Sequence, residues 1–395
     1  MSRQAATIAA RFGVDADSAH GAVMPPLYLS SNYSFAGFAQ KRRYDYTRSG
    51  NPTRDVLASA LAELEGGAGG VVTSSGMSAI TLLTAQLKPE DLLIAPHDCY
   101  GGCYRLFKAQ ADRGLYQVDF IDFTDQAAIT AALARKPKVV WIETPSNPLL
   151  RITDIAAVAR LAHAVEATVV VDNTFLSPAL QQPIALGADL VVHSTTKYLN
   201  GHSDVVGGAV VWKDAALGEQ IAWWCNCLGV GGAPFDSYLT LRGLRTLQPR
   251  LRAHQENANA LADVLTRHPA VEKVYFPALP THPGHALAAR QQRGFGAMLS
   301  FDLAGGEPAV AAFVDGLTCF TLAESLGGVE SLVAHPATMT HASMDAAARR
   351  RAGIGDGLVR VSVGIEATED LVADFEVALD LARAATASQR AKAIG

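Results

Sequence analysis

The sequence predicts an α/β fold, with a mostly parallel, seven-stranded sheet in a large domain and a smaller C-terminal α/β domain. Two observations lead to this prediction. Short runs rich in Val, Ile and Leu recur, and several are apolar on consecutive residues, as in strands buried on both faces. Segments with helical spacing, such as Ile155–Val165, separate these runs and give the βαβ rhythm of a parallel sheet.

The predicted elements follow one another in two groups. The large sheet is expected to contain Gly70–Thr73, Leu92–Pro96, Val118–Asp122, Val139–Thr144, Thr168–Val171, Leu190–His193 and Gly208–Trp212. A long helical stretch then runs from Phe235 to about Arg267, and we expect any break in it at Pro249. The smaller domain is expected to contain strands Val271–Tyr275, Ala297–Leu303, Thr318–Leu322 and Leu358–Val363 and the helix Asp370–Ala384. These groups predict an arm (1–50), a large domain (51–245) and a C-terminal domain (246–395).

The composition excludes several classes of protein. Hydrophobic residues make up 49% and charged residues 18% of the 395, which is enough for a sizeable core. The net charge of −5 disfavours nucleic-acid binding, and no apolar run is long enough to span a membrane. The N-terminus lacks the apolar centre of a signal peptide, and the five cysteines form no CxxC pair. We therefore expect a cytoplasmic protein with reduced thiols and no metal site.

The first candidate site residue, Asp172, directly follows a predicted strand. In parallel sheets ligands bind beyond the carboxyl ends of the strands, so residues at these positions are the first candidates. A carboxylate there is costly unless it is paired. From this residue alone, a helix cap or a structural salt bridge is the more frequent explanation. The functional alternative is a partner for a buried cation, such as a protonated pyridine nitrogen.

Lys197 follows the next predicted strand after Ser194-Thr195-Thr196. Burial lowers the pKa of an amine, which Schiff-base chemistry requires, and the hydroxyl groups suit a phosphate. A lone lysine is more often a surface residue whose charged end reaches water. That explanation is weaker here, because Asp172 and Lys197 end adjacent predicted strands on the same edge.

A third strand end lies upstream, where Ser74-Ser75-Gly76-Met77-Ser78 precedes an apolar helix. Small residues before a helix expose backbone N–H groups to an anion, although many such turns bind nothing. Together the three strand ends offer an anion cradle, an amine and a carboxylate. This is the set that pyridoxal phosphate (PLP) requires.

Seven motifs also resemble those of the PLP-dependent enzymes of Cys/Met metabolism, and the match is closest to the bacterial γ-synthases among them. The motifs are YDYTRSGNPTR (44–54), APHDCYGGCYRLF (95–107), ETPSNPLL (143–150), VVVDNTFLSPALQQP (169–183), HSTTKYLNGHSDVVGG (193–208), FTLAESLGGVESL (320–332) and VRVSVGIE (359–366). The resemblance implies the aspartate-aminotransferase-like PLP fold (fold type I). It also implies a homotetramer, a dimer of dimers with shared active sites.

The resemblance assigns roles to individual residues. Lys197 would form the Schiff base and shuttle protons, Asp172 would pair with the pyridine nitrogen, and Tyr100 would stack on the ring. The phosphate would be held by Gly76, Met77, Ser194 and Thr196, with Tyr46 and Arg48 contributed by the neighbouring subunit. The substrate would be bound by Arg360 at its α-carboxylate, with Asn147 and Ser325 nearby, and by Glu324, Arg105 and Ser49.

The implied activity is γ-replacement, in which O-succinylhomoserine or another O-acylhomoserine and cysteine give cystathionine and the free acid, in methionine biosynthesis. The alternative is the γ-lyase reaction, which releases cysteine, 2-oxobutanoate and ammonia from cystathionine. Glu324 resembles the γ-specific members, whereas β-lyases tend to carry an aromatic residue there. Ser49 resembles γ-lyases instead, because the synthases carry a second basic residue after Arg48. A serine acyltransferase or hydrolase using Ser194 and Lys197 is disfavoured, since its SDN and KTG motifs are absent.

Overall fold

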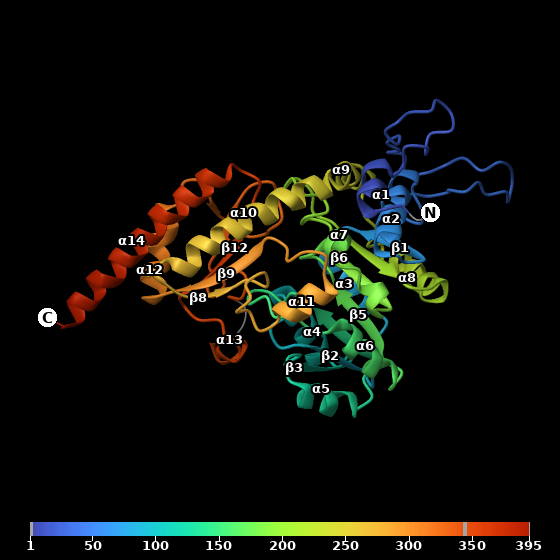
Figure 1. Ribbon diagram of the computed structural model, residues 1–395. Coiled ribbons are helices and arrows are strands. Elements are labelled where there is room, and N and C mark those ends of the chain that lie inside the picture. Colours follow the sequence, from blue (N-terminus) through green and yellow to red (C-terminus); the bar gives the residue numbers. More distant parts are fainter. Residues whose placement is uncertain (1–2, 343–345, 395) are drawn as a thin grey trace.

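The computed structural model describes residues 3–342 and 346–394 and contains two β-sheets (Figure 1). The larger sheet has the order β1-β7-β6-β5-β4-β2-β3. Its strands are β1 (Gly69–Thr73), β2 (Leu92–Pro96), β3 (Gln117–Ile121), β4 (Val139–Glu143), β5 (Thr168–Asp172), β6 (Leu190–Ser194) and β7 (Gly208–Trp212). All pairs are parallel except those of β7, which runs antiparallel to β1 and β6. The predicted mostly parallel, seven-stranded sheet is confirmed, with every strand within one residue of its expected bounds.

Helices cover both faces of this sheet, which explains why its strands are apolar on consecutive residues. One core packs Val169 and Val171 of β5 against α2 (Pro52–Glu65), α5 (Gln126–Leu133) and α6 (Ile155–His163). The other packs Val170 against α3 (Gly76–Thr84), α4 (Gly101–Asp112) and α8 (Ala215–Leu228). The connections contain α7 (Ser177–Leu180), a 3-10 turn (Pro183–Leu186), α11 (His285–Gln291) and α13 (Ala346–Ala352).

The smaller sheet has the order β10-β11-β12-β9-β8 and is antiparallel except for the pair β10–β11. Its strands are β8 (Val271–Tyr275), β9 (Met298–Leu303), β10 (Thr321–Leu322), β11 (Leu332–Ala334) and β12 (Leu358–Ser362). The helices α10 (Leu247–Arg267), α12 (Gly306–Gly316) and α14 (Thr368–Ile394) supply the other side of its core. Figure 1 shows this lobe in yellow to red beside the blue-to-green lobe of the larger sheet.

Two sequence-based expectations for this half were wrong in detail, and one strand was missed. The strand expected from Thr318 is only two residues long, because the Thr318 N–H and hydroxyl donate to Asp374 of α14 at 2.8 and 2.7 Å. The strand β11 was not predicted. The last helix extends to Ile394, ten residues beyond the expected end at Ala384.

The expected long helix is divided, but not at Pro249. Helix α9 (Pro234–Leu244) ends before Arg245 and Thr246, and α10 begins at Leu247. Pro249 is the third residue of α10, where backbone N–H groups have no partner within a helix, so the missing N–H costs no hydrogen bond.

The N-terminal segment contains one short helix, α1 (Ala5–Arg11), followed by a long irregular stretch. Figure 1 shows this stretch as blue loops that extend away from the body of the protein. Several of its large apolar side chains are exposed, among them Val23, Leu29 and Phe38. Among the described residues, no helix combines the length and apolar character needed to cross a membrane.

Candidate active site

A cavity of about 350 Å³ lies at the carboxyl ends of β4, β5 and β6 and beside the start of α3. It brings together eleven of the residues predicted from the sequence: Lys197, Asp172, Gly76, Met77, Ser194, Thr196, Tyr100, Arg360, Asn147, Ser325 and Glu324. The carboxyl edge of the parallel strands, where the sequence predicted a ligand site, therefore forms the cavity.

Lys197 lies in the turn after β6, with its amine inside the cavity. The Nζ atom donates a hydrogen bond to Ser325 Oγ at 2.5 Å. Burial and, to a smaller extent, the charge of Arg360 lower the pKa of this amine, and Glu324 opposes them; together they bring it to about 8. A buried amine with this pKa is a suitable nucleophile for an aldehyde. Ser325 has φ +87, a left-handed conformation that is rare outside glycine and is frequently found at functional sites.

Asp172 is the last residue of β5 and accepts a hydrogen bond from the Thr174 N–H at 3.0 Å. Burial raises the pKa of its carboxyl group. Beside it in register lies the buried Glu143 of β4, whose carboxylate accepts the Tyr100 N–H at 2.8 Å. Glu143 was not predicted as a site residue. It lies within a predicted strand, one residue before the expected end, and the carboxyl-end rule would have found it.

The start of α3 forms the candidate anion cradle. Ser75 caps the helix by accepting the Ser78 N–H at 3.0 Å, and the amides of Gly76 and Met77 lie in the first turn, which lacks intrahelical partners. A Cβ on Gly76 would lie 2.9 Å from the Ser194 Cβ, so glycine allows the helix to approach β6. With the hydroxyls of Ser194 and Thr196 in the same cavity, this donor set fits a phosphate.

Tyr100 precedes α4, and its ring lies over the first turn of that helix. A Cβ on Gly102 would lie only 2.4 Å from the Tyr100 Cε1 and 2.8 Å from the Met77 sulfur. Burial raises the pKa of Tyr100, and the positive charge of Arg105 on α4 opposes this. The ring is therefore placed between the candidate phosphate cradle and α4.

Arg360 reaches the cavity from β12 of the smaller sheet and is 3% exposed. Its guanidinium donates to Asn147 Oδ1 at 3.1 Å and to the Ser325 carbonyl at 2.9 Å. Its Nε has no hydrogen-bond partner among the residues that the structure describes. Burial lowers the pKa of the guanidinium to about 10. A buried cation with spare donors fits an incoming carboxylate.

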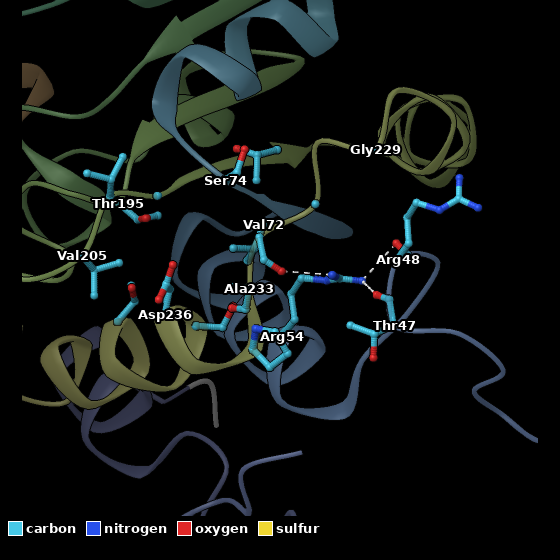
Figure 2. Close-up of a pocket in the computed structure, with 18 of the residues that line it drawn as sticks. Thr47, Arg48, Arg54, Val72, Ser74, Thr195, Val205, Gly229, Ala233 and Asp236 are labelled. Atoms are coloured by element: carbon cyan, nitrogen blue, oxygen red, sulfur yellow. Dashed lines mark hydrogen bonds between the residues drawn. The ribbon is translucent and has the colours of Figure 1, made fainter. Parts of the chain in front are cut away.

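Four predicted residues lie outside this cavity: Tyr46, Arg48, Ser49 and Arg105. Tyr46 and Arg48 line a separate cavity of about 400 Å³, which Figure 2 shows around Arg54. The Arg48 guanidinium donates to the Asn226 carbonyl at 3.1 Å. The Ser49 hydroxyl donates to Asp45 at 2.9 Å within the arm.

The fold and the cavity define a PLP-dependent enzyme of fold type I, with an amine, an acid and a phosphate cradle at the ends of parallel strands. The chain belongs to the Cys/Met metabolism PLP-dependent enzyme family, whose model matches residues 6–380.

Several relatives are similar over nearly their full length. The cystathionine γ-synthase of Escherichia coli (strain K12) is 61% identical over 95% of this chain and 98% of its own. A crystal structure of cystathionine γ-synthase from Xanthomonas oryzae pv. oryzae in complex with cystathionine is 64% identical, with a TM-score of 0.96 over 98% of this chain and all of its own. A cystathionine γ-lyase structure from Lactobacillus plantarum is 42% identical, with a TM-score of 0.93 over 96% of this chain and all of its own.

Proposed function

We propose that this chain catalyses the cystathionine γ-synthase reaction. In this reaction cysteine replaces the acyloxy group of O-succinylhomoserine or another O-acylhomoserine, giving cystathionine and the free acid. The observation that carries the proposal is the identity of 61% and 64% to γ-synthases over nearly the whole chain. A γ-lyase and a β-lyase relative are 42% and 46% identical over similar lengths. The reaction belongs to methionine biosynthesis.

The residues of the cavity have roles that follow from their surroundings. Bound PLP supplies an electron sink for negative charge that develops at the substrate Cα. Arg360 binds the α-carboxylate, because it is a buried cation with an unpaired donor. Lys197 takes up and returns protons at the substrate carbons, which a pKa of about 8 permits near neutral pH. Asp172 would hold the proton on the pyridine nitrogen, and the ring of Tyr100 would lie over the cofactor, since both residues line the cavity.

Two residues bear on the choice between replacement and elimination. Glu324 lines the cavity, where its charge raises the pKa values of both Lys197 and Arg360, so it lies close to the substrate position. A carboxylate there fits the γ-specific members of the family. Ser49 favours γ-elimination of cystathionine, because it leaves the motif after Arg48 without a second cation. For this reason the γ-lyase reaction stays the second candidate.

We also propose a homotetramer, a dimer of dimers in the cytoplasm, in which Tyr46 and Arg48 complete the phosphate site of a neighbouring subunit. Support comes from their position outside their own chain's Lys197 cavity and from the exposed apolar side chains of the arm. A mixture of the Arg48→Ala and Lys197→Ala variants, each of which should be inactive alone, tests this. Refolding them together should restore part of the activity if sites are shared, whereas no recovery would contradict it.

The reaction is tested by supplying O-succinylhomoserine, O-acetylhomoserine or cystathionine, each with and without cysteine. Cystathionine formation from an acylhomoserine and cysteine is the expected main activity. Dominant release of cysteine from cystathionine alone would instead establish the γ-lyase reaction. Borohydride should bleach the yellow protein, because it reduces the Schiff base and leaves the cofactor covalently attached to Lys197. A colourless protein that is acylated at Ser194 would point to the serine acyltransferase class.

A further inference from the structure

Glu143 is a buried carboxyl group beside the site that the chemistry described above does not use. It ends β4 and is the register partner of Asp172 on β5. Glu143 is 6% exposed. Carboxyl oxygens of Glu143 and Asp172 and the sulfur of Cys103 lie within 4.8 Å of one another. Two carboxyl groups therefore lie next to each other at the carboxyl ends of the adjacent strands β4 and β5.

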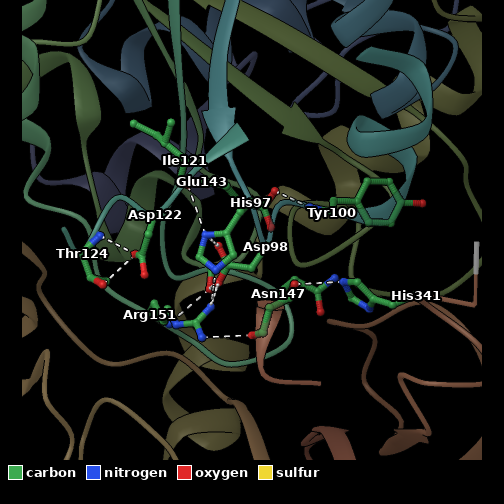
Figure 3. Close-up of polar contacts among 12 residues, drawn as sticks. His97, Asp98, Tyr100, Ile121, Asp122, Thr124, Glu143, Asn147, Arg151 and His341 are labelled. Carbon is green, nitrogen blue, oxygen red and sulfur yellow. Dashed lines mark hydrogen bonds and ion pairs between the residues drawn. The ribbon is translucent and has the colours of Figure 1, made fainter. Parts of the chain in front are cut away.

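The three acidic residues in this region, Asp98, Asp172 and Glu143, differ in how their negative charge is compensated. Asp98 accepts hydrogen bonds from Arg151 Nη1 and Ser146 Oγ, both at 2.7 Å (Figure 3). Asp172 faces the proposed position of the pyridine nitrogen. In the part of the chain that the structure describes, no Lys, Arg or His forms an ion pair with Glu143. A buried carboxylate without a cation is strongly disfavoured, so this group is the one expected to be neutral.

The titratable groups that face Glu143 agree with this assignment. Burial raises the pKa of Glu143 well above its usual range, and the charges of Asp172 and Asp98 add to the effect, against the smaller opposing influence of the Tyr100 and Asn147 N–H groups. Burial also raises the pKa values of the Cys99 and Cys103 thiols, so both stay neutral. Two adjacent acids commonly share one proton, so we expect the carboxyl pair to carry a single negative charge.

Glu143 also holds the backbone that carries the cofactor-covering ring. Its Oε2 accepts the Tyr100 N–H at 2.8 Å, and Figure 3 shows this contact from the strand end to the residue before α4. Tyr100 occupies the N-cap position of α4, and its side chain makes no capping hydrogen bond. The position of the ring above Gly102 therefore depends on an acceptor supplied from β4.

We propose that Glu143 is an uncharged positioning residue, which fixes the Tyr100 backbone and ring and leaves the negative charge of the buried carboxyl pair on Asp172. The inference rests on the proposed roles of Tyr100 and Asp172 toward PLP. It predicts that PLP binding requires an acceptor oxygen at residue 143 and does not require a side chain that can ionise there.

The test compares Glu143→Gln, which keeps an acceptor oxygen and cannot ionise, with Glu143→Ala, which removes the acceptor. Holoenzymes are titrated with pH while the visible absorbance and the induced circular dichroism of the cofactor are recorded. PLP affinity of the apoenzymes is measured by equilibrium dialysis. The Gln variant should keep the wild-type absorbance midpoint and bind PLP within about twofold. The Ala variant should bind PLP about tenfold more weakly and show altered circular dichroism, because a buried N–H loses its partner.

Two results would overturn the proposal. A shifted midpoint or tenfold weaker PLP binding in Glu143→Gln would show that the carboxylate charge is needed. Wild-type dichroism and affinity in Glu143→Ala would show that Tyr100 needs no acceptor. If the Ala variant does not fold, the Gln variant still decides, because an unchanged midpoint supports a neutral Glu143 and a changed one contradicts it. No amino-acid substrate enters these measurements, so they stand whichever reaction the chain catalyses.

Discussion

The amine of Lys197 in the apoenzyme should react with PLP at a rate that rises with pH through a midpoint near 8. The reacting form is the neutral amine. At pH 7.5 an ordinary lysine with a pKa of 10.5 is neutral in about one molecule in a thousand, whereas a pKa of about 8 leaves about a quarter neutral. Burial in the cavity therefore increases the amount of nucleophile by roughly 250-fold at this pH.

The two charged neighbours of Lys197 predict the sign of the change in variants. Glu324 favours the ammonium form, so Glu324→Gln should move the midpoint to lower pH. Arg360 disfavours the ammonium form, so Arg360→Gln should move it to higher pH. Glu307 is an exposed residue of α12, and Glu307→Gln is a matched control that should leave the midpoint unchanged.

The assay follows the growth of cofactor absorbance after apoenzyme is mixed with PLP, over roughly pH 6 to 10. The same reaction with an Nα-acetylated lysine corrects for the titration of PLP itself. A wild-type midpoint close to that of the free lysine derivative would refute the argument from burial. An upward shift in Glu324→Gln would refute the assigned influence of that carboxylate.

Three further substitutions test other parts of the site. Arg360→Lys keeps the charge but loses the planar fork, so KM for the amino-acid substrate should rise by about ten- to a hundredfold with a smaller change in kcat, as steady-state kinetics would show. Gly76→Ala places a Cβ 2.9 Å from the Ser194 Cβ and should weaken PLP binding by about tenfold in dialysis, while the circular dichroism of the backbone stays unchanged. Asp98→Asn leaves Arg151 without its charged partner and should lower the free energy of unfolding by about 2 kcal/mol in denaturant titrations; an unchanged denaturation midpoint would contradict this.

The sequence predicted the larger sheet better than the smaller one for a physical reason. Strands covered by helices on both faces are apolar on consecutive residues, and this pattern located every strand from β1 to β7. In the smaller sheet β11 has three residues and β10 has two, which is too short for any periodicity to be visible. The division between α9 and α10 was misplaced, because Pro249 interrupts a helix only beyond the first turn.

Site residues that end strands of the larger sheet were predictable from the sequence. Residues that tertiary packing brings to the cavity from elsewhere in the chain were less predictable. Asp172, Lys197 and Gly76 became candidates because three strand ends together offer an acid, an amine and an anion cradle, and the structure places all three in one cavity. Arg360 enters from the smaller sheet, a contact that no spacing in the sequence reveals, and its place was expected only from the family resemblance. Glu143 was missed because it lies inside the predicted strand, one residue before the expected end, and its pairing with Asp172 becomes visible only in the structure.

The antiparallel direction of β7 explains how two of these strand ends are held together. Because β7 runs against β1 and β6, its first residue, Gly208, pairs with the last residues of both. A Cβ on Gly208 would lie 2.2 Å from the Ser75 carbonyl oxygen, and the preceding Gly207 N–H donates to the Thr196 hydroxyl at 3.0 Å. A parallel strand in this position would begin at the opposite edge and would bring its last residues here, so the turn before β7 would lie at the other end of the sheet. The one reversed strand therefore joins the turn that caps α3 to the turn that carries Lys197, and so fixes the candidate phosphate cradle relative to the amine.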